Sequence, residues 1–146
     1  MPSSPVDPHG LIDPRGPRFA AVLTSLVLAT ALITGSTPLL AAQTLVFAAG
    51  AIGGHRYAPY GWLYRTLVRP RLRPPAELED PRPPRFAQAV GLGFTLLATL
   101  AAVASLGWLA LALTALALAA AFLNAAFDYC LGCEFYLLLH RRSPAH

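Results

Sequence analysis

The stretch FAQAVGLGFTLLATLAAVASLGWLALALTALALAAAFLNAAF, residues 86–127, contains no Asp, Glu, Lys or Arg. As one continuous helix it would be about 63 Å long, roughly twice the hydrocarbon thickness of a bilayer. Ser105, Gly107 and Trp108 interrupt the aliphatic run near its middle, which is a turn signal. The stretch therefore predicts a hairpin of two membrane-spanning helices, at about residues 86–104 and 108–127.

A second charge-free stretch, residues 19–54, is divided by the turn signal GSTP at residues 35–38. It predicts spans at about residues 19–35 and 38–54. Each apolar block is about 24 Å of helix, so flanking residues must complete the span of a hydrocarbon core of about 30 Å. The predicted fold class is all-α: a polytopic membrane protein with four transmembrane helices, forming a single membrane domain over residues 1–146.

Composition supports a membrane protein rather than a soluble one. The chain is 55% hydrophobic and only 12% charged, whereas soluble domains carry about 25% charged residues. Its net charge of +4 does not indicate nucleic-acid binding, because every arginine lies beside a hydrophobic block. Arginines in these places contact lipid headgroups, so the expected partner is the lipid bilayer.

The arginines also predict orientation. All 11 basic residues are arginines, and they occur before the first block, in the central segment and after the last block, with none in the two turns. Under the positive-inside rule, both termini and a linker at residues 55–85 face the cytoplasm. We therefore expect a multi-pass protein of the plasma membrane. Within the linker, residues 55–73 mix aromatic residues with arginines, as at a membrane interface, and residues 74–84 are rich in proline.

The two halves of the chain share short motifs. PRGPRFA at residues 14–20 recurs as PRPPRFA at residues 81–87. A second pattern recurs 72 residues later: Tyr57, Tyr64 and Arg69 match Tyr129, Tyr136 and Arg141. The motifs predict two parallel helical hairpin repeats, related by an axis along the membrane normal. A chance match between proline- and arginine-rich borders is the alternative. In this alignment Cys130 and Cys133 correspond to Ala58 and Gly61.

Cys130 and Cys133 are the two cysteines of the chain, in a CxxC motif. Three interpretations compete. The pair is a redox or sulfur-handling dithiol, with Gly132 leaving room for the backbone of a partner. It is half of a metal site, for which His55 and His140 are the nearest candidates; no metal is expected, because a second pair of ligands is missing. Or it has no chemistry. Because cytosolic thiols are kept reduced, a stable structural disulfide is not expected.

The reactivity of the pair depends on the local backbone. If Cys130 ends the fourth helix, the negative end of that helix opposes a thiolate. If Asp128 instead caps a new helix, Cys130 lies in its first turn, where the positive end favours a thiolate. We favour the second arrangement, because Asn124 and Asp128 are both residues that commonly cap helices.

The chain resembles a known family. The residues that carry the resemblance are Val6-Asp7-Pro8, the motif DPRGPRF at residues 13–19, the four spans, and the signature CxGCxxY formed by Cys130, Gly132, Cys133 and Tyr136. It looks like a bacterial integral membrane family of unknown function, domain of unknown function 4395, over residues 13–141. The resemblance implies a membrane protein whose genes often lie near those for thioredoxin-like and rhodanese-like proteins. It therefore implies thiol or sulfur chemistry with such a partner, and assigns no activity.

Two functional hypotheses follow. In the first, the protein is a cytoplasm-facing thiol–disulfide or sulfur-relay component, in which Cys130 and Cys133 exchange while Tyr129, Gly132 and Tyr136 shape the site. In the second, it is a non-catalytic membrane scaffold or anchor that docks a soluble partner on its arginine-rich face. The sequence leaves open whether the protein is an enzyme.

The sequence identifies no cofactor. A quinone or lipid-borne ligand between the repeats, near Gly50 and Gly54 where small residues leave space, is a further alternative. Three features disfavour it: the cytoplasmic location of the cysteines, the absence of a second cysteine pair, and the absence of histidine or charge within the spans.

Overall fold

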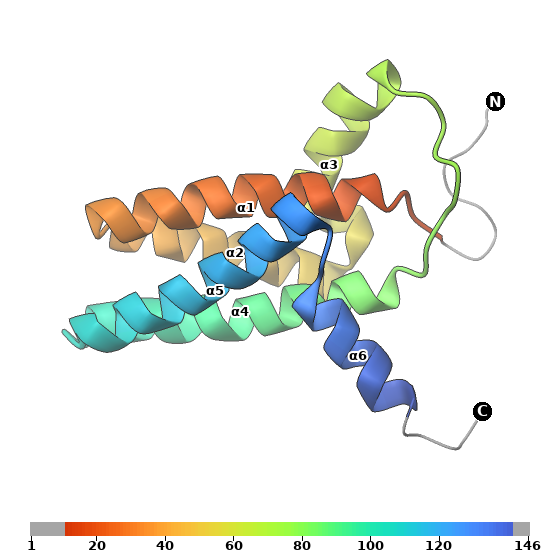
Figure 1. Cartoon of the computed structure of the whole chain (residues 1–146). Coiled ribbons are helices and arrows are strands. Elements are labelled where there is room, and N and C mark those ends of the chain that lie inside the picture. Colours follow the sequence, from red (N-terminus) through yellow and green to blue (C-terminus); the bar gives the residue numbers. More distant parts are fainter. Residues whose placement is uncertain (1–10, 142–146) are drawn as a thin grey trace.

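The computed structural model describes residues 11–141. The regular structure of this part is helical, and one isolated bridge joins Ile12 and Glu79. Figure 1 shows a bundle of four long helices, α1 (Arg15–Thr34), α2 (Thr37–Gly53), α4 (Arg82–Val103) and α5 (Gly107–Phe127). Short helical segments join the two halves: η1 (His55–Tyr57), α3 (Pro59–Leu63), η2 (Tyr64–Val68) and η3 (Arg69–Arg71). A last helix, α6 (Leu131–Arg141), follows α5. The all-α prediction is confirmed. Val6-Asp7-Pro8 and the side chains of His55 and Arg141 lie outside the described part.

The interior of the bundle is lined by small and hydroxyl-bearing side chains. Leu28, Gln43 and Thr95 are fully buried, and most other buried residues of the bundle are alanines and threonines. Large aliphatic residues point outward instead: Ile33 is 84% exposed and Leu45 71%. A soluble protein rarely leaves so many large apolar side chains in water. In a bilayer the same arrangement is favourable, because small residues allow close helix packing while large apolar ones contact lipid tails.

Three of the helices, α1, α4 and α5, are long and apolar enough to cross a membrane. They contain 20, 22 and 21 residues. The fourth, α2, is also apolar but has 17 residues, which corresponds to about 26 Å. Three spans are thus supported by length and composition, and the fourth span stays a prediction.

The predicted turns lie where the structure has them. Gly35 ends α1 with φ 68°, and the Ser36 hydroxyl then accepts a hydrogen bond from the Leu39 N–H at the start of α2. Between α4 and α5, Ser105 adopts φ 66°. The starts of α1 and α4 were predicted too late, because both helices begin four residues earlier, at Arg15 and Arg82. Prolines occupy the first turns there, where their missing N–H groups have no helical partner to lose.

The predicted linker at residues 55–85 is more ordered than expected. Its first part forms η1, α3, η2 and η3, and α3 packs against α1. Within it, Ala58 and residues 72–81 are non-helical. Residues 72–81 are tied to the start of the described chain, since Ile12 and Glu79 exchange two backbone hydrogen bonds of 2.8 Å. Residues 55–71, predicted as part of an aromatic and arginine-rich interface segment, form short helices that pack on the end of the bundle.

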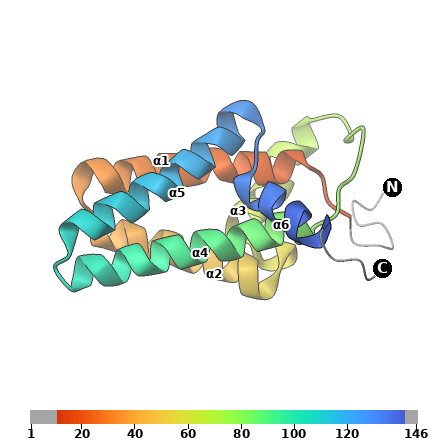
Figure 2. The same ribbon diagram turned by 60° about the horizontal axis from the view of Figure 1, so that its bottom comes forward.

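Both hairpins are arranged in the same way (Figures 1 and 2). The helices α1 and α4 begin at one end of the bundle, and both hairpin turns lie at the other end. Across the bundle, α1 packs along α5 and α2 along α4. The described arginines belong to the first turns of α1 and α4, to the connection between the halves, and to α6. They therefore gather at the end away from the turns.

The same contacts occur in both halves. The Arg18 Nε donates to the Ala125 carbonyl near the end of α5, and the Arg85 Nε donates to the Ala51 carbonyl near the end of α2. The rings of Phe19 and Tyr64 are 5.7 Å apart at 50°, and those of Phe86 and Tyr136 are 5.7 Å apart at 52°. Each half thus uses one arginine to cap a helix of the other half, since carbonyls at a helix end lack partners.

Candidate functional site: the cysteine pair and the cavity beside it

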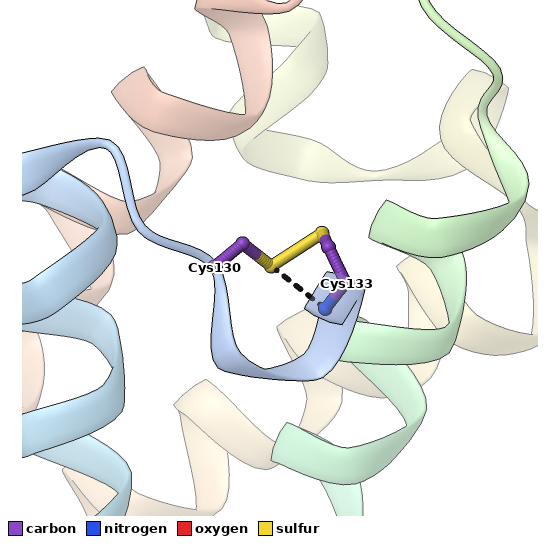
Figure 3. The surroundings of a disulfide bond; sticks show 2 residues. All are labelled: Cys130 and Cys133. Atoms are coloured by element: carbon purple, nitrogen blue, oxygen red, sulfur yellow. Dashed lines mark hydrogen bonds between the residues drawn. A yellow bond between two sulfur atoms is a disulfide. The ribbon is translucent and has the colours of Figure 1, made fainter. Parts of the chain in front are cut away.

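A sharp break separates α5 from α6. Asp128 ends α5 in the left-handed conformation, with φ 55°. Cys130 then precedes α6: its carbonyl accepts the Glu134 N–H at 3.0 Å, and its Sγ accepts the Cys133 N–H at 3.1 Å (Figure 3). Cys130 therefore caps α6 with its own sulfur, as Ser or Thr oxygens do elsewhere. The prediction of a new helix is confirmed, and the assignment of Asp128 as its cap was wrong.

The structure holds Cys130 and Cys133 joined as a disulfide (Figure 3). Their Cα atoms are 5.2 Å apart, within the usual range for a bridge. The sequence predicted a reduced pair, so the disulfide differs from that prediction. Both residues are half-buried. When the pair is reduced, the N-terminal peptide groups of α6 favour negative charge on the Cys130 sulfur.

Gly132 and Tyr136 dock α6 against α4. A Cβ at Gly132 would lie 2.6 Å from the Cα of Ala87, so the two helix backbones touch at this glycine. The space that we expected to admit a partner's backbone is therefore taken by α4. The Tyr136 ring packs on Phe86 and stacks on His140, with ring centroids 4.0 Å apart. The Tyr129 side chain, by contrast, is 47% exposed. Two of the three expected site-shaping residues thus position α6, and Tyr129 lies beside the pair.

The described residues contain no group of three His, Cys, Asp or Glu side chains that could hold a metal ion. His140, one of the two histidines considered as ligands, is stacked on Tyr136. The side chain of His55 lies outside the described part.

A cavity of about 910 Å³ lies between the two halves, beside the cysteine pair. Its walls come from α1, α2, α4, α5, α6 and residues 79–84. Cys130 and Cys133 line it, and so do Ala58 and Gly61, the residues that match them in the first half. The two matched positions therefore border one shared space. The space predicted between the repeats near Gly50 is part of this cavity, because Gly50 lines it. A cavity at the cysteines was not predicted.

The polar residues of the cavity wall are unevenly charged. Four acids line it: Glu79, Asp80, Asp128 and Glu134. Arg85 also lines it, but its guanidinium already donates to the Ala51 and Ile52 carbonyls. Asp80 is paired with Arg82, and the other three carboxylates leave an excess of negative charge that disfavours anionic ligands.

Gln43 and Asn124 are uncharged polar residues within the apolar blocks, which predicts hydrogen bonds between helices. The two behave differently. The Gln43 amide donates to the Thr24 hydroxyl at 3.4 Å and accepts from the Tyr60 hydroxyl at 2.7 Å. The Asn124 side chain also lines the cavity, but within residues 11–141 it makes no hydrogen bond. The expectation is confirmed for Gln43 and wrong for Asn124.

A second polar cluster at the same end was missed from the sequence. The buried Asp13 carboxylate accepts the Tyr64 hydroxyl at 2.8 Å and the Arg15 Nη2 at 2.9 Å. Burial would raise the pKa of Asp13, but these hydrogen bonds outweigh burial and hold that pKa below its ordinary value. Burial and the neighbouring carboxylate raise the pKa of Tyr64 to about 12. The repeated Asp-Pro-Arg at residues 13–15 and 80–82 was the signal that could have revealed the cluster.

In the second half the equivalent cluster is incomplete. Asp80 binds Arg82, as Asp13 binds Arg15. The Tyr136 hydroxyl, however, makes no hydrogen bond to Asp80 or to any other described residue. The cluster around Asp80, in the half that carries the cysteines, therefore has one hydrogen bond fewer than the cluster around Asp13, because the tyrosine hydroxyl does not take part.

Residues 12–141 match the family described as Domain of unknown function (DUF4395). The chain belongs to this family. The match covers the whole bundle, the cysteine pair and α6, so the site described above lies within the DUF4395 domain. No curated protein and no solved structure matches the chain.

Proposed function

We propose that this DUF4395 protein is a membrane thiol–disulfide or sulfur-relay component whose exchanging groups are Cys130 and Cys133. One observation carries the proposal. The cysteine pair caps the start of α6 and lines a large cavity, half-buried rather than enclosed in a core. Reactive cysteines occupy such positions at helix N-termini, whereas buried structural cysteines are inert.

We infer different roles for the two sulfurs. In the reduced pair, Cys130 receives the N-terminal hydrogen bond of α6 and is the nucleophile. Its thiolate attacks a disulfide of a soluble partner, a mixed disulfide forms, and one partner thiolate leaves. Cys133 then attacks the Cys130 sulfur, which closes the bridge and releases the partner as a dithiol. Two electrons and two protons pass from the pair to the partner, and the reverse sequence oxidises a partner dithiol. Family resemblance suggests a thioredoxin-like or rhodanese-like partner.

The proposal includes a membrane topology. We place α2 across the bilayer as a fourth span, so that the chain forms two parallel hairpin repeats of one membrane domain. The matched contacts of the two halves support this arrangement, and so does the common end at which α1 and α4 begin. From the positive-inside rule we infer that this end of the bundle, the cysteine pair and both termini face the cytoplasm at the plasma membrane.

A scaffold is the second candidate, and one observation favours it. The connection between the halves exposes Tyr57 and Trp62, which are 65% and 57% exposed, together with Arg56, Arg71 and Arg73. Such a surface can hold lipid headgroups or an acidic partner without any chemistry at the cysteines.

Trapping separates the two candidates. Cys133→Ala is expected to accumulate a mixed disulfide or persulfide on Cys130 in membranes, because the resolving sulfur is missing. Mass spectrometry of the Cys130 peptide reads the result, and the double variant Cys130→Ala/Cys133→Ala is the control. If neither single variant captures anything while a soluble partner still co-purifies, the scaffold function replaces exchange.

A further inference from the structure

We propose that the cavity beside the cysteine pair binds an uncharged, lipid-soluble quinone, which accepts two electrons from the reduced pair. This inference rests on the exchange function proposed above and names the group that restores the disulfide. It is argued from the shape, charge and unmet hydrogen bonds of the cavity.

The size and lining of the cavity suit a flat, apolar ring. Its volume of about 910 Å³ lies within the usual range of small-molecule sites, about 300–1,000 Å³. Four phenylalanines contribute to its walls: Phe47, Phe86, Phe94 and Phe135. The remaining lining is largely alanine, glycine, leucine and proline. Phenylalanine rings pack against flat rings with a favourable stacking contribution.

The charges of the wall disfavour the common anionic amphiphiles. Four acids line the cavity, one of which, Asp80, is paired with Arg82, and the guanidinium of Arg85 is committed to two helix-end carbonyls. A fatty acid, an anionic phospholipid or a coenzyme A thioester would bring further negative charge into this space without a free cation to receive it. A quinone carries no charge.

One side-chain amide of the wall has unmet hydrogen bonds. The Asn124 side chain makes no hydrogen bond within the described residues. An amide N–H donates to a quinone carbonyl, and the hydroxyl of a hydroquinone donates to an amide oxygen. A ring that carries oxygen can therefore hydrogen-bond to this amide, which a plain acyl chain cannot do.

The electron transfer is balanced. Cys130 and Cys133 each lose the hydrogen on sulfur, the S–S bond forms, and the quinone takes up two electrons and two protons to become a hydroquinone. Together with exchange, the net reaction oxidises a partner dithiol at the expense of the quinone pool. Disulfides in cytosolic proteins are mostly transient and redox-sensing. A redox-responsive soluble partner fits a pair at the cytoplasmic face.

The test mixes reduced, full-length protein with a short-chain ubiquinone under anaerobic conditions, in nanodiscs of phosphatidylcholine. We expect one hydroquinone and one Cys130–Cys133 disulfide per protein, read by absorbance and by mass after alkylation. Ala120→Phe places a ring into the cavity, since Ala120 lines it, and should slow the reaction at least tenfold. Ala119→Phe adds the same ring on the exposed side of α5 and should not. Asn124→Leu, which keeps the side-chain size, should weaken quinone binding by about tenfold, as expected for one lost hydrogen bond.

Equal rates in Ala120→Phe and Ala119→Phe, or no hydroquinone at all, would overturn the inference. Reduction of the Cys130–Cys133 disulfide of the same proteins by dithiothreitol is measured in parallel. If that reduction persists while the quinone reaction is absent, the quinone site fails and the proposed function stands. If reduction by dithiothreitol is absent too, the proposed function itself fails.

Discussion

The Cys130 sulfur makes two interactions. It forms the disulfide with Cys133, and it accepts a hydrogen bond from the Cys133 N–H in the first turn of α6. The sequence predicted a helix start near this point but assigned the cap to Asp128. Aspartate is common at helix N-caps, and it also tolerates the left-handed conformation better than most residues. Here the second property decides, since Asp128 ends α5 with φ 55°. A propensity alone cannot distinguish the end of one helix from the start of the next.

Tyr64→Phe tests the buried cluster at the residue scale. The variant removes the 2.8 Å hydrogen bond to the Asp13 carboxylate. We expect a loss of roughly 1.5–3 kcal/mol in the free energy of unfolding, as is usual for hydrogen bonds to charged groups. Unfolding in mild detergent measures it. Tyr136→Phe is the matched control and should cost much less, because the Tyr136 hydroxyl makes no hydrogen bond among the described residues.

The dependence of stability on pH tests the same cluster in a second way. The pKa of Asp13 is lowered in the folded protein, so its stabilisation is present above the ordinary aspartate pKa of about 3.9 and is lost as the pH falls through the folded pKa. Asp13→Asn should flatten this acid dependence. An unchanged acid profile in Asp13→Asn would contradict the cluster.

At the scale of helices, glycine positions were predicted less well than helix ends. In the sequence, small residues four apart, Gly50 with Gly54 and Ala89 with Gly93, predict close helix packing. Gly50 does face the Gln88 side chain, but a Cβ at Gly93 would meet nothing within 4 Å. The packing glycine of α4 is Gly91, which lies under the Phe47 ring. Which face of a helix meets its neighbour depends on helix rotation, and an all-round apolar sequence does not encode that rotation.

Gly132→Ala tests the docking of α6 on α4. The new Cβ would lie 2.6 Å from the Ala87 backbone, so α6 must shift. We expect a destabilisation of about 1–3 kcal/mol, typical of overpacking, and faster alkylation of the reduced Cys130 and Cys133. Gly93→Ala is the control, and it should be neutral or slightly stabilising, by up to about 1 kcal/mol, because alanine is the better helix former. Equal behaviour of the two variants would contradict the contact.

For the whole molecule, the hairpins and their turns were predictable, because charge-free blocks and the turn signals at residues 35–38 and 105–108 carry that information locally. The helices between residues 55 and 71 were not, because they are short and lack periodicity. The cavity was not predictable either. It lies among α1, α2, α4, α5 and α6, so it depends on packing between distant segments of the chain.

The topology prediction also belongs to this scale. A reporter fused after His146 should be active in the cytoplasm, and one inserted at Gly35 or Ser105 should be active outside, because the arginines lie at the end opposite the turns. Fusions read by alkaline phosphatase and a fluorescent protein provide the two activities. Cytoplasmic activity at Gly35 would remove α2 as a span.

The central claim is that Cys130 and Cys133 exchange. The most direct measurement is the fraction of their disulfide in membranes equilibrated with glutathione buffers of stepped redox potential, read by mass after alkylation. An exchanging pair should titrate reversibly as a two-electron couple, with a midpoint between about −270 and −120 mV, the range of thiol–disulfide exchange proteins. A midpoint below about −300 mV would identify a structural disulfide. A pair that stays reduced at every potential would be inert, and either result would contradict exchange.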